Sequence, residues 1–194
     1  VADDSLDMRM DILTETTAAD IVNNSSREEL HKIFFEYGEE RESGKIAAAI
    51  VRLRQDSPVS TSGMLAKIID DTVTSHRKNK AKARIFQALR IAVNKELEVL
   101  QSALEDAVHL LNPTGRIVVL SYHSLEDRIV KHFFREQEKD CICPSFLPVC
   151  QCSKQSVLKV ITRKPITPTG KEIEENPRAR SAKMRIAEKK ARTA

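Results

Sequence analysis

The segment at residues 112–131 constrains the fold of this 194-residue chain more than any other part. It opens with Asn-Pro-Thr-Gly at residues 112–115, which is typical of a turn. Four apolar residues follow at 117–120, two of them β-branched valines, and this run predicts a strand buried on both faces, as in a parallel sheet. The residues after it are polar and then helical in pattern, so the segment predicts a strand, a tight loop and a helix.

The helix is predicted to begin at Ser124. Its hydroxyl can accept a hydrogen bond from a free backbone N–H group of the first turn, and Asp127 stands where a capping box places its acid. The apolar residues that fall on one face of this helix are Leu125, Ile129, Val130, Phe133 and Phe134. In open α/β sheets, ligands bind beyond the carboxyl ends of the strands, where this chain places residues 121–124. The spacing of those four residues, taken alone, favours a plain polar turn.

The string SYHSLEDRIVK at residues 121–131 resembles the signature of the MraW/RsmH family. Further stretches resemble that family in the same order along the chain: LDMRMD at 6–11, YGEE at 37–40, FQALRI at 86–91 with VN at 93–94, and NPRARS at 176–181. The resemblance covers nearly the whole chain. Members of this family are S-adenosylmethionine-dependent methyltransferases that modify the N4 of a cytidine in 16S ribosomal RNA.

The resemblance implies that the polar loop carries the chemistry, with Ser121, Tyr122, His123 and Ser124 as the candidate catalytic residues. The cytosine amine is a weak nucleophile, so hydrogen bonds must align it with the methyl group of the cofactor, and positioning can supply much of the rate. His123 could take the leaving proton, although a structural role is the alternative. The base must leave its stack to reach such a pocket, where Tyr122 could stack on it.

Two other parts of the family pattern carry candidate residues. The stretch at residues 6–11 could place Asp7 or Arg9 near the substrate, and its alternative is an ion-paired linker. Asn94 also matches the pattern, although it could be an ordinary amide on a helix surface.

The implied fold class is α/β, namely part of a Rossmann-like class I methyltransferase sheet with an inserted all-helical subdomain. We expect residues 1–11 to end a first catalytic segment, residues 12–93 to form a helical substrate-recognition insert, and residues 94–194 to continue the catalytic domain. The five glycines are scattered and form no G-x-G-x-x-G turn, which would let the backbone approach a nucleotide-type ligand. We therefore expect the cofactor-binding half to precede Val1, and this chain alone to be inactive.

The helical insert is predicted from caps and apolar periodicity. A short helix is expected at residues 17–22, a capping-box pattern begins at Ser26, and the Ser-Thr-Ser at 60–62 caps another helix. A further helix is expected over residues 39–55. Residues 81–111 carry apolar side chains at spacings of three and four throughout, which predicts one long helix shared by both domains. Two strands, at residues 157–162 and 180–188, are expected to pair antiparallel at the sheet edge.

Two basic segments are candidates for RNA binding. Residues 76–84 hold five Lys or Arg residues and no acid, among them Arg77, Lys78 and Lys80. Such residues release counterions when they neutralise phosphates, although a solvated loop is the alternative. Arg178 and Arg180 are less certain, because they could instead hold the sheet edge to a carboxylate. The net charge of +4 does not by itself indicate a nucleic-acid partner.

The four cysteines of the chain all lie in a loop at residues 140–154, outside the core pattern of the family: Cys141, Cys143, Cys150 and Cys152. Four thiolates can bind zinc tetrahedrally, although C-x-C pairs are less usual than C-x-x-C pairs. A disulfide pair and free thiols are the alternatives, and disulfides are disfavoured in a cytoplasmic protein.

The sequence shows no apolar run of membrane-spanning length and no visible signal peptide, which favours a cytoplasmic enzyme. The resemblance implies 16S ribosomal RNA or the small ribosomal subunit as its partner. Its oligomeric state is not indicated. Two other classes of function stay open: a non-catalytic RNA- or ribosome-binding module that needs no cofactor, and a zinc-stapled interaction domain built on the cysteine loop. Binding of the cofactor would separate the first class from the other two.

Overall fold

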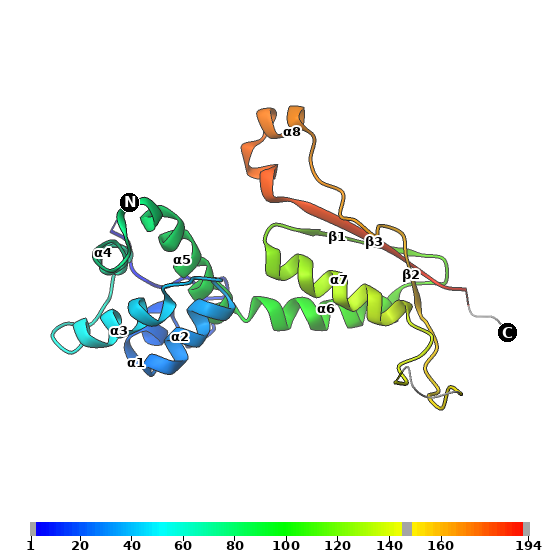
Figure 1. The fold of residues 1–194 in the computed structure, drawn as a ribbon, viewed down its shortest axis with the longest axis horizontal. Coiled ribbons are helices and arrows are strands. Elements are labelled where there is room, and N and C mark those ends of the chain that lie inside the picture. Colours follow the sequence, from blue (N-terminus) through cyan, green and yellow to red (C-terminus); the bar gives the residue numbers. More distant parts are fainter. Residues whose placement is uncertain (1–2, 145–148, 192–194) are drawn as a thin grey trace. The chain divides into compact units, whose positions relative to one another are not determined.

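The structure is a computed structural model that describes residues 3–144 and 149–191. It divides into two compact units, here called the helical unit, Val1–Glu96, and the sheet unit, Leu97–Ala194 (Figure 1). No helix in the described ranges is both long and apolar enough to cross a membrane.

The helical unit is built from five α-helices and one 3-10 turn in its described part, and most of its helix starts follow the predicted caps. The helices are α1 (Ala18–Asn24), α2 (Arg27–Glu36), α3 (Ser43–Leu53), α4 (Ser62–Thr72) and α5 (Lys78–Asn94), with the 3-10 turn η1 (Ser75–Arg77) before α5. The side chains of Thr17, Ser26 and Thr61 each accept a hydrogen bond from the backbone N–H three residues further on. These caps satisfy backbone groups that the first turn leaves free, which confirms the predicted starts.

The core of the helical unit includes the segment that precedes its first helix. Leu6 is buried with side chains from α1 to α5, and its N–H donates to the carbonyl of Ser60 at 3.0 Å. Gly38, which follows α2, permits a close approach to α5. A Cβ added there would lie 2.6 Å from the carbonyl oxygen of Phe34 and 2.9 Å from that of Arg84. Through Leu6, the segment at residues 5–9 packs as part of the helical unit, and through Gly38 the end of α2 lies close to α5.

The long helix predicted over residues 81–111 is wrong, because the chain breaks it at Lys95. This residue has the left-handed backbone angles φ 49° and ψ 39°, and its N–H closes α5 on the carbonyl of Ile91. A second helix, α6 (Glu96–Leu110), starts at the next residue. Apolar spacing continues across the break, so periodicity could not reveal it, and Lys is not a residue that marks this conformation.

The sheet unit holds a three-stranded antiparallel sheet in the order β1–β3–β2. Its elements are β1 (Arg116–Ser121), α7 (Ser124–Glu138), β2 (Leu158–Val160), α8 (Gly170–Glu175), the 3-10 turn η2 (Pro177–Ser181) and β3 (Lys183–Lys189). The predicted antiparallel pairing of the last two strands is confirmed. Helices α6 and α7 lie along the sheet (Figure 1) and share its core through Leu104, Val130 and Phe134, which pack with Leu158 and Ala187.

Strand β1 forms where it was expected, but it is not buried on both faces. Ile117 and Val119 pack on the core, whereas Val118 and Leu120 are 56% and 53% exposed. Within the described residues its one paired neighbour is β3, in antiparallel register with Val118 opposite Ile186. Four apolar residues in a row show no alternation, so the sequence could not show which face of β1 the rest of this chain covers.

Candidate functional site

The loop at the carboxyl end of β1 is held by a capping box that differs from the predicted one. His123, not Ser124, is the N-cap of α7: its Nδ1 accepts the Glu126 N–H at 3.4 Å. The Glu126 carboxylate reaches back and accepts the N–H groups of Tyr122 at 2.8 Å and His123 at 3.2 Å. The acid of the box is therefore Glu126 and not Asp127, and two backbone donors of the loop are fixed by one carboxylate.

The environment of Glu126 favours its ionised form. Burial opposes that form, but the adjacent His123 side chain and the backbone N–H groups of Tyr122 and His123 outweigh it and lower the Glu126 pKa to about 2. His123 Nε2 is buried and lies 3.3 Å from Glu126 Oε1, without hydrogen-bond geometry. Because Nδ1 serves as the cap acceptor, a proton placed there would break the cap. His123 thus positions the loop here, and its role as a proton acceptor stays a prediction.

The other three candidates in this loop differ in exposure. Ser121 is buried, and its hydroxyl donates to the carbonyl oxygen of Lys183 at 3.3 Å, which ties the ends of β1 and β3 together. Tyr122 is 53% exposed on a backbone that Glu126 holds in place. Ser124 is exposed at the first position of α7. Of these three side chains, Tyr122 carries the one aromatic ring, and that ring is exposed.

A buried ion pair fixes the start of α7 to the sheet. Arg185 on β3 binds Asp127 through Nε to Oδ1 at 2.6 Å and Nη2 to Oδ2 at 3.1 Å, and Lys183 Nζ lies 3.5 Å from Oδ2. Burial raises the Asp127 pKa, but the two cations outweigh it and lower the pKa below its usual value. Sequence reasoning gave Asp127 a capping role and missed this pair. An arginine amid the apolar residues of β3 was the available signal.

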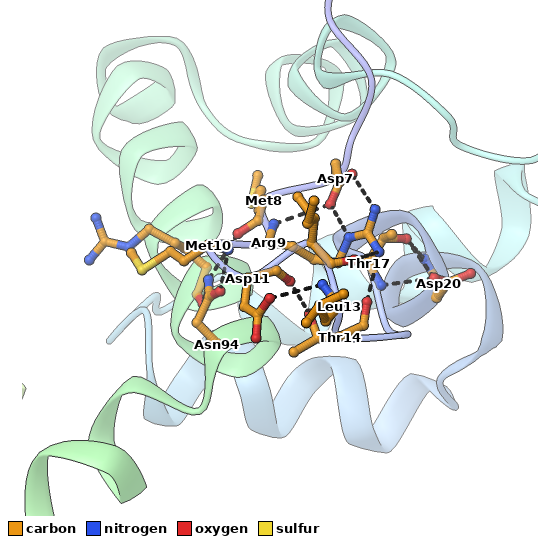
Figure 2. Close-up of polar contacts among 12 residues, drawn as sticks. Asp7, Met8, Arg9, Met10, Asp11, Leu13, Thr14, Thr17, Asp20 and Asn94 are labelled. Carbon is orange, nitrogen blue, oxygen red and sulfur yellow. Dashed lines mark hydrogen bonds and ion pairs between the residues drawn. The ribbon is translucent and has the colours of Figure 1, made fainter.

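In the helical unit, the loop at residues 7–14 is organised around Arg9 (Figure 2). Its guanidinium binds the Asp7 carboxylate at 2.7 and 2.9 Å and donates to the carbonyl oxygens of Thr14 at 2.7 Å and Ile12 at 3.3 Å. The bonds from Arg9 lower the Asp7 pKa, and the same pairing raises the Arg9 pKa. Met8 has a left-handed φ of 64° between them. The ion-paired alternative for this stretch is therefore present as a rigid loop.

Asn94 clamps the same loop from the last position of α5 (Figure 2). Its Oδ1 accepts the Met10 N–H at 2.8 Å, and its Nδ2 donates to the carbonyl oxygens of Met8 at 2.9 Å and Arg90 at 2.8 Å. Asn94 is thus more than a helix-surface amide. The clamp holds a turn whose apolar side chains at Met10, Ile12 and Leu13 are all exposed.

The segment at residues 76–84 carries three predicted RNA-binding residues, and two of them line one hollow of about 290 Å³. Arg77 and Lys80 share it with further residues, which are Glu40, Arg41, His76 and Arg84. The carboxylate of Glu40 pairs with Arg84 at 3.4 Å, so the cations of the hollow outnumber its single acid. Lys78 does not line it. Arg178 and Arg180 are exposed in η2, and within the described residues neither makes an ion pair.

A second basic hollow, of about 330 Å³, was not predicted from the sequence. It lies in the sheet unit, and its cationic lining comes from Lys131, Arg135, Lys139, Arg163 and Arg185. Lys131, Arg135 and Lys139 are four residues apart along α7 and its end, which places them on one helical face. That spacing was the signal available in the sequence.

The four cysteines converge in the loop between α7 and β2. Their Sγ atoms all lie within 4.8 Å of one another. The two C-x-C pairs therefore fold together, although Cys150 stands seven positions after Cys143 in the sequence.

The described residues thus comprise an α/β unit and a helical unit, an arrangement that fits part of a class I methyltransferase fold with additional helices. The sequence model of the MraW methylase family matches residues 1–190, so the chain belongs to that family.

Three curated relatives carry the name ribosomal RNA small subunit methyltransferase H. The protein from Carboxydothermus hydrogenoformans is 52% identical over 189 residues, and that from Desulfosudis oleivorans is 50% identical over 191. The protein from Clostridioides difficile is 48% identical over 191 residues. Each alignment covers 96% of this chain and 61% of the relative, so the chain spans about three fifths of the length of these relatives.

The described residues do not fit a nucleoside-type cofactor such as S-adenosylmethionine by themselves. None of the five glycines has a positive φ, and they do not cluster in a turn that could cradle such a ligand. The two basic hollows and a third, along α2, are lined mainly by charged and polar side chains.

Proposed function

We propose that this chain forms the RNA-facing part of an S-adenosylmethionine-dependent methyltransferase that modifies the N4 of a cytidine in 16S ribosomal RNA. Family membership over residues 1–190 and the names of the relatives support this function. The observation that carries it is the family signature at residues 121–131, whose first residues form a capped loop at the carboxyl end of β1 and whose remaining residues open α7. Action on the small ribosomal subunit implies work in the cytoplasm.

In this proposal the capped loop positions the target base. The Glu126 carboxylate fixes the backbone of Tyr122 and His123, so the exposed Tyr122 ring is presented without loss of loop order. A cytosine turned out of its stack could lie against that ring, and a base–aromatic contact of this kind is worth about 1–3 kcal/mol. Correct placement of the exocyclic amine is the contribution we assign to this loop.

The two basic hollows are the proposed contacts to the RNA backbone. The first, at Arg77 and Lys80, lies in the helical unit, and the second, at Lys131 and Arg135, lies in the sheet unit. Both present several cations around a space that can admit a phosphate group. Arg178 and Arg180, exposed in η2, are further candidates. Such contacts supply affinity without sequence specificity and depend on salt.

The clamped loop of the helical unit is a third proposed contact. Arg9, Asp7 and Asn94 hold its backbone rigid, so Met10 and Leu13 can stay exposed without collapsing onto the core. Apolar side chains on a fixed loop can pack against an unstacked base. Asp7 and Arg9 themselves are engaged with each other and position the loop.

The cofactor is expected to bind only when residues outside those described here complete its site. Calorimetric titration of S-adenosylmethionine into the 194-residue chain should show no measurable binding, whereas a longer protein that includes the rest of the family's length should bind it. Tight one-to-one binding of S-adenosylmethionine by the 194-residue chain would contradict the proposal that this chain alone does not form the cofactor site. Binding of RNA by the longer protein without cofactor binding or methyl transfer would favour the non-catalytic RNA-binding module.

A further inference from the structure

The cysteine loop joins the end of α7 to the start of β2 and brings its four thiols into one cluster. The Sγ atom of Cys150 lies 3.3 Å from that of Cys141, 3.5 Å from that of Cys152 and 4.0 Å from that of Cys143. The Cys141 and Cys152 sulfurs are 3.6 Å apart, and all four lie within 4.8 Å of one another.

These distances match the edges of a tetrahedron around one metal ion. A zinc–sulfur bond of about 2.3 Å places two tetrahedral thiolates about 3.8 Å apart. The separations of 3.3 to 4.0 Å lie on both sides of that value. A disulfide needs its sulfurs at about 2.05 Å, so no pair is bonded here. A [4Fe–4S] cluster would bind each thiolate to a different iron, and a [2Fe–2S] cluster would bind two thiolates to each of its irons, so either cluster would spread the four sulfurs further apart than one ion does.

Backbone N–H groups point at three of the sulfurs. Cys143 donates to Cys141 Sγ at 3.3 Å, within one C-x-C pair. Two other bonds cross between the pairs: Ile142 donates to Cys152 Sγ at 3.4 Å, and Gln151 donates to Cys143 Sγ at 3.4 Å. Donors aimed at sulfur stabilise thiolates, which are the form that binds a metal ion.

The ends of the loop are closed by bonds that do not involve the cysteines. Val157 N–H donates to the carbonyl of Gln137 at 2.9 Å, and Ser156 N–H donates to Asp140 Oδ1 at 3.2 Å. This closure brings the two C-x-C pairs side by side. The apolar residues next to the cysteines, Ile142 and Val149, are exposed, so apolar burial does not order the described parts of the loop.

We propose that Cys141, Cys143, Cys150 and Cys152 bind one Zn²⁺ ion as a structural site. Four protein ligands leave no open position for a substrate or for water, so the site orders the loop and takes no part in the chemistry. The binding free energy then stabilises the loop directly, because the four sulfurs converge only in the folded chain. This inference does not depend on the proposed function.

The first test is elemental analysis of the 194-residue protein, purified under reducing conditions without chelator. We expect one equivalent of zinc per chain. Replacement by Co²⁺ should give the strong d–d absorption of tetrahedral cobalt with a sulfur-to-metal charge-transfer band. Neither measurement requires a variant that folds poorly. Metal-free protein with four reactive thiols and no uptake of Zn²⁺ or Co²⁺, two disulfides found by mass spectrometry, or iron in place of zinc would overturn the proposal.

Variants then assign the ligands. Cys141→Ser and Cys150→Ser should each abolish stoichiometric zinc, while Gln151→Ala, which keeps the backbone N–H that donates to Cys143, should retain it. Limited proteolysis should cut residues 139–157 faster in the two serine variants and in chelator-treated wild type, with the helical circular-dichroism signal unchanged. Full zinc occupancy in both serine variants would contradict the assignment.

Discussion

The buried ion pair between α7 and β3 allows the sharpest prediction about stability. Asp127→Asn keeps the shape of the side chain but removes the charge that faces Arg185. The two side chains are only 11% and 6% exposed, so the guanidinium of the variant stays in a poorly solvated position without its counter-charge. We expect the sheet unit to be strongly destabilised.

The magnitude follows from the burial of both partners. Breaking a buried pair by removing one charge typically costs about 3–5 kcal/mol, and we expect the low end because the asparagine side chain keeps an oxygen that can accept a hydrogen bond from Arg185. Arg116 on β1 and Glu188 on β3 provide a matched control in the same sheet. Their pair is 2.9 Å long but 64% and 25% exposed, so Glu188→Gln should cost less than about 1 kcal/mol.

Hydrogen exchange at residues 183–189 measures the effect directly, because β3 pairs with both other strands of the sheet. Protection of the β3 amides should fall by about 100-fold in Asp127→Asn, which is the exchange equivalent of about 3 kcal/mol, and by less than about 10-fold in Glu188→Gln. Equal effects of the two variants would refute the claim that the Asp127–Arg185 pair locks α7 to the sheet.

Further predictions concern the two loops and the basic hollow. Asn94→Ala should increase hydrogen exchange in residues 8–14 while leaving the core of the helical unit protected; unchanged exchange would show that the clamp is unnecessary. Because the Glu126 pKa is lowered from 4.5 to about 2, its contribution to stability should be present above about pH 4.5 and lost as pH falls toward 2, so Glu126→Gln should flatten the stability profile in that window, and a parallel profile would contradict this. Arg77→Ala with Lys80→Ala should lower the salt dependence of RNA binding by about two units of slope; an unchanged slope would mean that the segment is only solvated.

Much of the helical unit follows from local rules. The caps at Ser26 and within residues 60–62 were predicted because a hydroxyl followed by the start of an apolar period is a signal carried within a few residues. The break at Lys95 could not be predicted, because one residue in a left-handed conformation leaves the apolar spacing intact. Periodicity therefore located the helices well and their boundaries less well.

The sequence predicted where the candidate site lies along the chain, but it did not predict the hydrogen bonds and ion pairs within the site. Ser124 is the more usual cap residue by type, yet His123 takes that position, and Asp127 turns to Arg185, 58 residues away. A bond across that distance depends on how β3 packs, which local patterns do not encode. The exposure of Val118 and Leu120 likewise depends on what covers β1, and the run at 117–120 could not reveal it.

We propose that this chain belongs to an enzyme that methylates cytidine N4 in 16S ribosomal RNA. The test is to incubate a protein that contains this chain and spans the length of its relatives with S-adenosylmethionine and small ribosomal subunits, digest the 16S RNA and measure the methylated nucleosides by mass spectrometry. We predict one new N4-methylated cytidine per RNA, with turnover reduced at least about 10-fold by Tyr122→Ala and largely retained by Tyr122→Phe, which keeps the stacking ring. RNA that is bound by the folded protein with cofactor present, yet gains no methyl group on cytidine N4, would contradict the claim.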